Sequence, residues 1–142
     1  MTYLLDTGII AELASANPDL GLIHWLDAQP EETIYISVVS LAEIAENIER
    51  QTSLTKKALL NNWLSNDLLV RFNNRICQIN ETVSLKWAEL ITRWKNSGRR
   101  LSLADSLSLA IALVYDHTLV THNVAIFENT GVKVLNPYET IK

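Results

Sequence analysis

The chain has 142 residues, 48% of them hydrophobic, which is enough apolar material for one domain with its own core. A net charge of −4 excludes a surface that binds nucleic acid through general positive charge, so basic contacts to a phosphate backbone would have to be local. The single cysteine excludes an internal disulfide and is typical of a reducing cytoplasm.

No linker-like segment and no internal repeat divides the chain, so we expect a single domain over residues 1–142. The start of the chain lacks the basic segment of a signal peptide, and the longest apolar stretch, 107–115, is too short to span a membrane. We therefore expect a cytoplasmic protein without a membrane segment.

Strand-like and helix-like segments alternate along the chain, which predicts an α/β fold. Asn80 and Gly98 are the expected cap residues at the two ends of one long helix. The expected strands lie at 3–6, 34–39, 75–79, 118–121 and 132–135. The expected helices lie at 9–14, 19–29, 40–48, 54–69, 81–97 and 105–115, with Ala58, Trp63 and Leu64 facing inward in the fourth of these.

Three carboxylates stand at junctions where a strand-like or loop segment gives way to a helix-like one. Asp6 ends the first strand, Glu43 follows the second strand, and Asp105 opens the last long helix. Ligands of doubly wound folds bind beyond the carboxyl ends of parallel strands. We therefore expect the three side chains to converge on one crevice.

The chemistry of such a crevice follows from its charge. Converging carboxylates repel one another, and the usual remedies are to protonate one of them or to bind a cation between them. Mg²⁺ and Mn²⁺ prefer oxygen ligands, so either ion suits an acidic cluster without histidine or cysteine. Such a site can activate water and stabilise charge on a phosphodiester. The acids therefore predict metal-dependent hydrolysis of a phosphate ester, with nucleic acid as the expected substrate.

Helix capping gives two of these acids an alternative role without catalysis. Ser40-Leu41-Ala42-Glu43 and Ser102-Leu103-Ala104-Asp105 both fit the pattern in which an acid reaches back to the amide of a capping serine. A cap of this kind contributes roughly 1 kcal/mol. Asp6 is harder to explain in this way, because a carboxylate that ends a strand buried on both faces needs a partner or a metal ion.

Four segments give the chain its resemblance to a known family. They are 4–13, with Leu-Leu-Asp-Thr-Gly; 36–44, with Ser-Leu-Ala-Glu; 98–107, with Ser-Leu-Ala-Asp; and 119–123, with Thr-His-Asn. In this order and at these separations they resemble a PIN-domain ribonuclease of the VapC toxin type, close to its FitB-like branch. The resemblance runs from Tyr3 to about Tyr138 and implies a three-layer α/β/α fold with a central, mostly parallel sheet.

The resemblance also implies a function. Asp6, Glu43 and Asp105 would be the metal-binding acids of an endoribonuclease that uses Mg²⁺ or Mn²⁺ and cleaves a structured RNA. Thr7 and Thr121 match positions beside the acids, where a hydroxyl can orient a carboxylate or a water, although turn chemistry explains them equally well. The family further implies a cognate VapB-like antitoxin that blocks the site, and a homodimer.

Three departures from the family's pattern bear on activity. Gly8 stands where the family usually has Asn, and His122 replaces a common Arg. Many relatives carry a fourth acid at the position of Asn123 or of Ile126, and neither is a carboxylate here. Asn123 can still hold a metal-bound water through its carbonyl, so we expect one tightly held metal and a second that binds weakly or only with substrate.

Two other functions fit part of the sequence. The missing fourth acid favours a PIN fold that has lost catalysis and acts as a binding or regulatory protein. Asp6-Thr7-Gly8 also matches the catalytic segment of a homodimeric aspartic protease, in which two subunits each contribute one carboxylate. The protease requires an almost all-β, glycine-rich chain, which four glycines and long helical stretches oppose.

Basic residues cluster just ahead of the third acid, at Arg93, Lys95, Arg99 and Arg100. Arg99 and Arg100 are the candidates for contacting an RNA backbone, whereas favourable interaction with a helix end explains Arg93 and Lys95 at least as well. The hydrophobic surplus of the helices at 40–70 predicts a surface for self-association or for binding a partner helix.

Overall fold

A computed structural model describes residues 1–138 of the chain. Its strands are β1 (Tyr3–Leu5), β2 (Ile34–Ser37), β3 (Ile76–Cys77), β4 (Thr118–Val120) and β5 (Val134–Leu135). They form one five-stranded sheet in the order β3-β2-β1-β4-β5, and each neighbouring pair is parallel. β1 lies in the middle, with Leu4 opposite Tyr35 of β2 and Leu119 of β4. The predicted α/β fold with a parallel sheet is confirmed.

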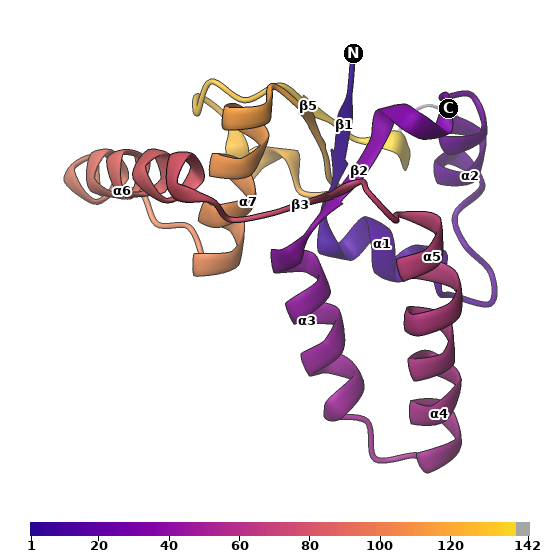
Figure 1. The fold of residues 1–142 in the computed structure, drawn as a ribbon. Helices are drawn as coiled ribbons and strands as arrows, with labels where there is room; N and C mark the ends of the chain where they lie inside the picture. Colours follow the sequence, from indigo (N-terminus) through magenta and orange to yellow (C-terminus); the bar gives the residue numbers. More distant parts are fainter. Residues whose placement is uncertain (139–142) are drawn as a thin grey trace.

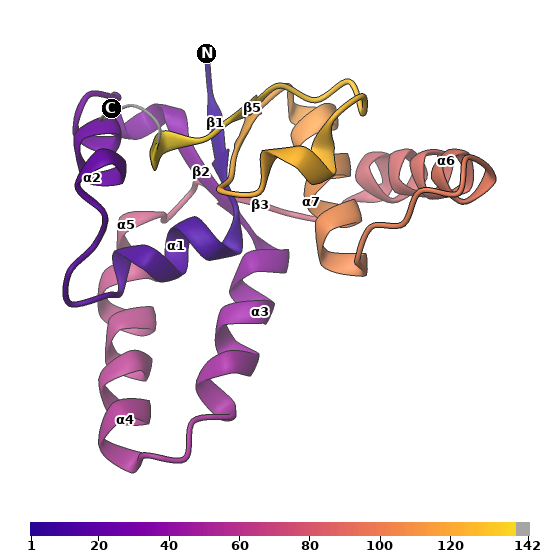
Figure 2. The ribbon, with the colours of Figure 1, turned by 180° about the vertical axis from the view of Figure 1, so that it is seen from behind.

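Helices cover both faces of this sheet (Figures 1 and 2). One layer holds α1 (Thr7–Leu13), α2 (Leu20–Asp27), α3 (Val38–Glu49), α4 (Leu54–Trp63) and α5 (Leu69–Arg71), and the other holds α6 (Glu81–Asn96) and α7 (Leu103–Tyr115). Short turns of other helix types are η1 (Glu31–Thr33), η2 (Leu64–Leu68) and η3 (Val124–Phe127). The expected three-layer architecture is confirmed. Within residues 1–138, no helix has the length and apolar character that crossing a membrane requires.

Neighbouring residues of the central strands point to opposite faces of the sheet and so reach two separate cores. Leu5 and Val120 pack in the core formed with α1, α2 and α3. Leu4 and Leu119 pack in the core formed with α6 and α7. All four side chains are at most 1% exposed. Burial on both faces explains why these strands are continuous apolar runs rather than alternating ones.

The second strand is shorter than predicted, and the helix after it starts earlier. The Ser37 hydroxyl accepts a hydrogen bond from the Ser40 amide at 3.2 Å, so Ser37 caps α3, and Val38 and Val39 belong to the helix. The predicted cap at Ser40 is therefore wrong, and Glu43 lies in the second turn of α3. Both serines are suitable caps, and the two β-branched valines between them favoured the later one in the sequence pattern.

The helix predicted at 54–69 is interrupted. α4 ends at Trp63, and the π turn η2 follows it. Trp63 and Leu64 pack against the core as predicted, whereas Ala58 is exposed, contrary to the prediction. Leu60 faces the core, and Ala58 lies about 200° from it around the helix axis, on the solvent side.

α6 ends in a glycine motif that sets the direction of the following segment. Asn80 caps the start of the helix, as predicted, and Gly98 has a φ of 78° just beyond its end. The amide of Arg99 donates to the carbonyl of Trp94 at 2.9 Å, and that of Gly98 donates to the carbonyl of Lys95 at 3.2 Å. These two bonds form a Schellman motif. Backbone amides therefore satisfy carbonyls at the end of α6.

The side chain of Arg99 ties the α6–α7 connection to the segment after β4. Its guanidinium donates to the carbonyl of Ile126 at 2.5 Å and to the carbonyl of Glu128. Both carbonyls lie at the end of η3. A charged donor thus closes the contact between two segments that are distant in sequence.

We predict that Arg99→Gln lowers the free energy of unfolding by about 1–3 kcal/mol, because it removes charged hydrogen bonds to two carbonyls. Urea unfolding followed by circular dichroism measures the change. Arg100→Gln is the matched control: its side chain has no hydrogen bond or ion pair within residues 1–138, so stability should stay within about 0.5 kcal/mol of wild type. Equal effects of the two substitutions would contradict this role for Arg99.

Candidate active site

The three predicted acids lie where helices begin, at the carboxyl edge of the sheet. Asp6 follows β1 and is the N-cap of α1, and Glu43 lies in α3, which follows β2. α7 runs back toward the start of β4, so its first turn, which contains Asp105, lies at the same edge (Figure 1). The starts of α3 and α7 face each other, since Glu43, Leu103 and Ala104 line one apolar recess of about 300 Å³.

The pKa of Asp6 shows that the acids share one electrostatic environment. Burial raises this pKa most, and the negative charges of Asp105 and Glu43 also raise it. Hydrogen bonds from the Thr121 hydroxyl and the Ile9 amide lower it, the amide donating at 2.9 Å. The structure thus brings the three acids close enough for their charges to interact.

Glu43 is held by hydroxyl groups. The Thr7 hydroxyl donates to Oε1 of Glu43 at 2.5 Å, and the Ser40 hydroxyl lies 3.0 Å from the same threonine oxygen. Ser40 is buried, whereas Glu43 is exposed. This role of Ser40 was not predicted, because the residue fits a helix cap. The available signal was its spacing of three residues from Glu43, which places both side chains on one side of a helix.

Thr121 holds Asp6 from the neighbouring strand. Its side chain is fully buried, its hydroxyl bonds to Asp6, and its Oγ1 accepts from the amide of Asn123 at 3.1 Å. Asn123 is exposed. Ile126, the other position at which relatives carry a fourth acid, packs against the core formed with α6 and α7. The backbone of Asn123 is therefore linked to Asp6 through Thr121, while Ile126 is a packing residue.

Asp105 occupies the third position of α7. Within residues 1–138, the Asp105 carboxylate accepts no bond from the Ser102 amide, contrary to the capping pattern. Ser102 is nevertheless the N-cap, as predicted, and its hydroxyl accepts from the Asp105 amide at 3.0 Å. That bond uses the backbone of Asp105. The carboxylate charge acts on Asp6, so capping and a role at the acidic edge are compatible for this residue.

The two other departures from the family's pattern can also be located. A Cβ added at Gly8 would lie 3.7 Å from Oδ1 of Asp6, an ordinary contact, so the site has room for a larger side chain. The ring of His122 packs on that of Tyr138, with centroids 4.5 Å apart. Burial raises the pKa of Tyr138, and nearby carboxylates, Asp6 among them, raise it further. Tyr138 is therefore a neighbour of Asp6 that was not predicted.

The donor set suits a divalent ion, but the side chains are not arranged around one. All three acids supply oxygen, which Mg²⁺ and Mn²⁺ prefer. In the part of the chain that the structure describes, no three His, Cys, Asp or Glu side chains are placed to hold a metal ion together. The Glu43 carboxylate is turned to Thr7, and its exposure leaves it room to rotate toward the other two acids.

The two arginines proposed for RNA contact have different surroundings. Arg99 donates to backbone carbonyls of η3 and the residue after it. Arg100 lines a recess at the end of α6 and has no ion pair within residues 1–138. Their adjacency in sequence therefore does not make them one functional unit.

Comparison with known proteins agrees with this architecture. The chain matches the family model described as PIN domain over residues 3–133. The plasmid stability protein StbB of Pseudomonas syringae pv. tomato is 33% identical over 96% of this chain and 98% of its own length. The VapC ribonuclease Y4jK of Sinorhizobium fredii is 29% identical over 96% of this chain and 97% of its own. The toxin FitB of Neisseria gonorrhoeae is 29% identical over 95% of this chain and 97% of its own.

Solved structures share the fold over nearly the whole chain. The crystal structure of FitAcB from Neisseria gonorrhoeae has a TM-score of 0.89 at 28% identity, over 96% of this chain and 99% of that one. The structure of FitAB bound to an IR36 DNA fragment has a TM-score of 0.88 at 28% identity, over 96% of each chain. These matches confirm the resemblance found in the four sequence segments, and the chain belongs to the PIN-domain family.

Proposed function

We propose that the chain is the toxin of a type II toxin–antitoxin system, an endoribonuclease that cleaves a structured RNA with Mg²⁺ or Mn²⁺. The observation that carries this proposal is the placement of Asp6, Glu43 and Asp105 at one edge of the sheet, where burial and the charges of the other two acids raise the pKa of Asp6. A cation relieves such repulsion. Membership of the PIN-domain family and the relatives named VapC ribonuclease and toxin FitB support the activity and the role.

In this proposal, some residues of the chain bind the metal ion and others orient them. Asp6, Glu43 and Asp105 would hold the metal ion, which would supply Lewis-acid chemistry and a lowered pKa of bound water. Thr121 orients Asp6, and Thr7 orients Glu43 through the bonds described above. The exposed amide of Asn123 provides a carbonyl oxygen for a water at the fourth position. The two threonine hydroxyls fix the carboxylates without neutralising them.

We also propose a VapB-like antitoxin as partner, and a homodimer in the cytoplasm. The structures of FitAcB and FitAB support the partner, because each of these names joins two components. α3 and α4 form a hairpin that stands away from the sheet (Figure 1). Its Leu54 and Leu59 are 83% and 67% exposed, and such apolar side chains suit a partner helix. The free, buried Cys77 suits a reducing compartment.

The other functions have less support. An aspartic protease is inconsistent with a parallel sheet whose Asp6-Thr7-Gly8 segment opens a helix. A PIN fold without catalysis is the second candidate, because Asn123 and Ile126 replace the fourth acid. The cleavage experiment below distinguishes it from the nuclease.

Purified protein should cleave a pool of structured RNAs with Mg²⁺ or Mn²⁺ and should not do so with EDTA. Asp105→Asn should lower the rate at least about 100-fold, because it removes a charged group at the reacting centre. Asp67→Asn, which changes an exposed carboxylate in η2, is the matched control and should retain activity. Absence of cleavage by folded, antitoxin-free protein would favour the non-catalytic PIN protein.

Asp6→Asn should stabilise the metal-free protein at pH 7 by about 0.5–2 kcal/mol. The folded-state pKa of Asp6 is raised, so ionisation costs stability above the unfolded-state value, and this cost vanishes below it. Urea unfolding in EDTA should show the gain at pH 7 and little gain below about pH 3.9, the ordinary value for aspartate. A gain of equal size at both pH values would contradict this origin.

Asn123→Asp should tighten Mn²⁺ binding about ten-fold, because it adds a carboxylate next to the Asp6–Thr121 pair. Isothermal titration calorimetry measures the affinity and the number of ions bound. Asn73→Asp adds the same charge at an exposed residue after α5 and should leave Mn²⁺ binding unchanged. If the two variants bind Mn²⁺ with equal affinity, Asn123 does not belong to the metal site.

A further inference from the structure

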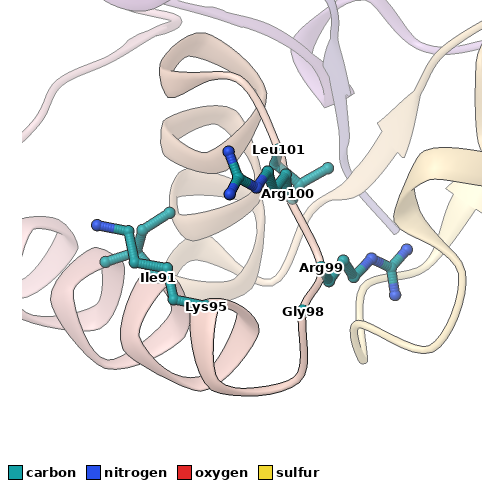
Figure 3. Close-up of a pocket in the computed structure, with 6 residues that line it drawn as sticks. All are labelled: Ile91, Lys95, Gly98, Arg99, Arg100 and Leu101. Carbon is teal, nitrogen blue, oxygen red and sulfur yellow. The ribbon is translucent and has the colours of Figure 1, made fainter.

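A recess of about 450 Å³ lies between the end of α6 and the start of α7 (Figure 3). It is lined by Ile91, Lys95, Gly98, Arg99, Arg100 and Leu101. Carbonyls at the end of α6, those of Trp94 and Lys95, accept backbone amides of the Schellman motif. The cations of the recess are therefore not needed to satisfy this helix end.

Arg99 and Arg100 point to opposite sides of the connecting segment (Figure 3). The guanidinium of Arg99 turns to the carbonyls of Ile126 and Glu128 and is used there. That of Arg100 points to the side on which α6 carries Lys95. The recess thus has two available cations, Lys95 and Arg100, rather than the adjacent arginine pair.

Few other cations are available in the part of the chain that the structure describes. Of the Lys and Arg residues within 1–138, six form ion pairs with Glu, and Arg99 is bound to carbonyls. Within residues 1–138, the Lys and Arg side chains without a hydrogen bond or ion pair are Lys56, Lys95, Arg100 and Lys133. Two of these four line the same recess, and no carboxylate lines it with them.

The recess is close enough to Asp105 for one extended ligand to contact both the recess and the acids. Arg100 lies five residues before Asp105, so the two backbones are at most about 18 Å apart. The apolar side chains of Ile91 and Leu101 form part of the lining and reduce the screening of charges by water. A polyanion that extends along this edge would meet positive charge here and carboxylates further on.

We propose that Lys95 and Arg100 bind a backbone phosphate of an RNA strand that extends to the acidic edge, whereas Arg99 takes no part in binding. The choice of RNA as the polyanion rests on the proposed nuclease function. A protein of net charge −4 repels RNA overall, so a local pair of free cations is needed to hold the strand. Arg100 offers the planar fork that matches a phosphate, and Lys95 adds a second charge.

The test measures RNA binding without cleavage. Asp105→Asn protein in EDTA is titrated into a fluorescein-labelled RNA hairpin, and fluorescence anisotropy is followed between about 50 and 200 mM KCl. Lys95→Gln and Arg100→Gln in this background should each weaken binding about three- to ten-fold at the lowest salt. Each should also reduce the slope of log affinity against log salt by about 0.7–0.9.

Two controls carry the same loss of charge. Lys56→Gln and Lys133→Gln remove the remaining available cations, which do not line this recess, and should change RNA affinity less than about two-fold. Circular dichroism and thermal unfolding confirm that each variant is folded. The proposal is overturned if Lys95→Gln and Arg100→Gln both have the same RNA affinity and the same salt slope as these controls. The proposal would also be overturned if these two variants lost binding to a labelled polyglutamate peptide but kept their binding to RNA, because the recess would then bind an acidic peptide.

Failure of this proposal is distinguishable from failure of the nuclease. Because binding is measured in EDTA, a protein that cleaves no RNA can still show the loss of affinity. A protein that cleaves RNA can equally show no loss of affinity in the Lys95→Gln and Arg100→Gln variants.

Discussion

Parallel pairing of β1 with both β2 and β4 is the constraint on which the site depends. Two parallel strands end at the same edge of a sheet, whereas a hairpin would send the second strand's end to the opposite edge. The crossover through α1 and α2 permits this pairing, and it brings the start of α3 beside the start of α1. Because α7 leads into β4 on the far side of β1, its first turn reaches this edge as well. The three acids lie at one edge of the sheet because the parallel strands end there.

Bringing three carboxylates to one edge costs folding free energy, and the chain offsets only part of that cost. Asp6 accepts from an amide and a hydroxyl, and Glu43 accepts from a hydroxyl. Within residues 1–138, no Lys or Arg forms an ion pair with any of the three acids. A basic partner would satisfy the acids permanently and compete with a cation. Neutral donors orient the carboxylates and leave their negative charge available.

The sequence was sufficient where local pattern and three-dimensional contact agree. The first strand and the cap at Ser102 follow from short segments, and the structure has both, although the strand ends at Leu5 and Asp6 caps the next helix. Ser40 was assigned wrongly because α3 is capped three residues earlier than predicted. Ala58 was assigned wrongly because the apolar stripe of α4 faces another direction. The contact of Arg99 with Ile126 could not be predicted, because it joins segments with no shared local pattern.

The different roles of Arg99 and Arg100 follow from backbone geometry. A Schellman motif with Gly98 ends α6, and the chain then leaves in a non-helical segment, in which successive side chains point to opposite sides. One arginine therefore faces η3 and the other faces α6. At about 0.1 M salt, charges act over about 10 Å, so a distant cation contributes little to holding RNA at the acidic edge. What matters for a protein with net negative charge is which cations remain unpaired near that edge, and local geometry decides this.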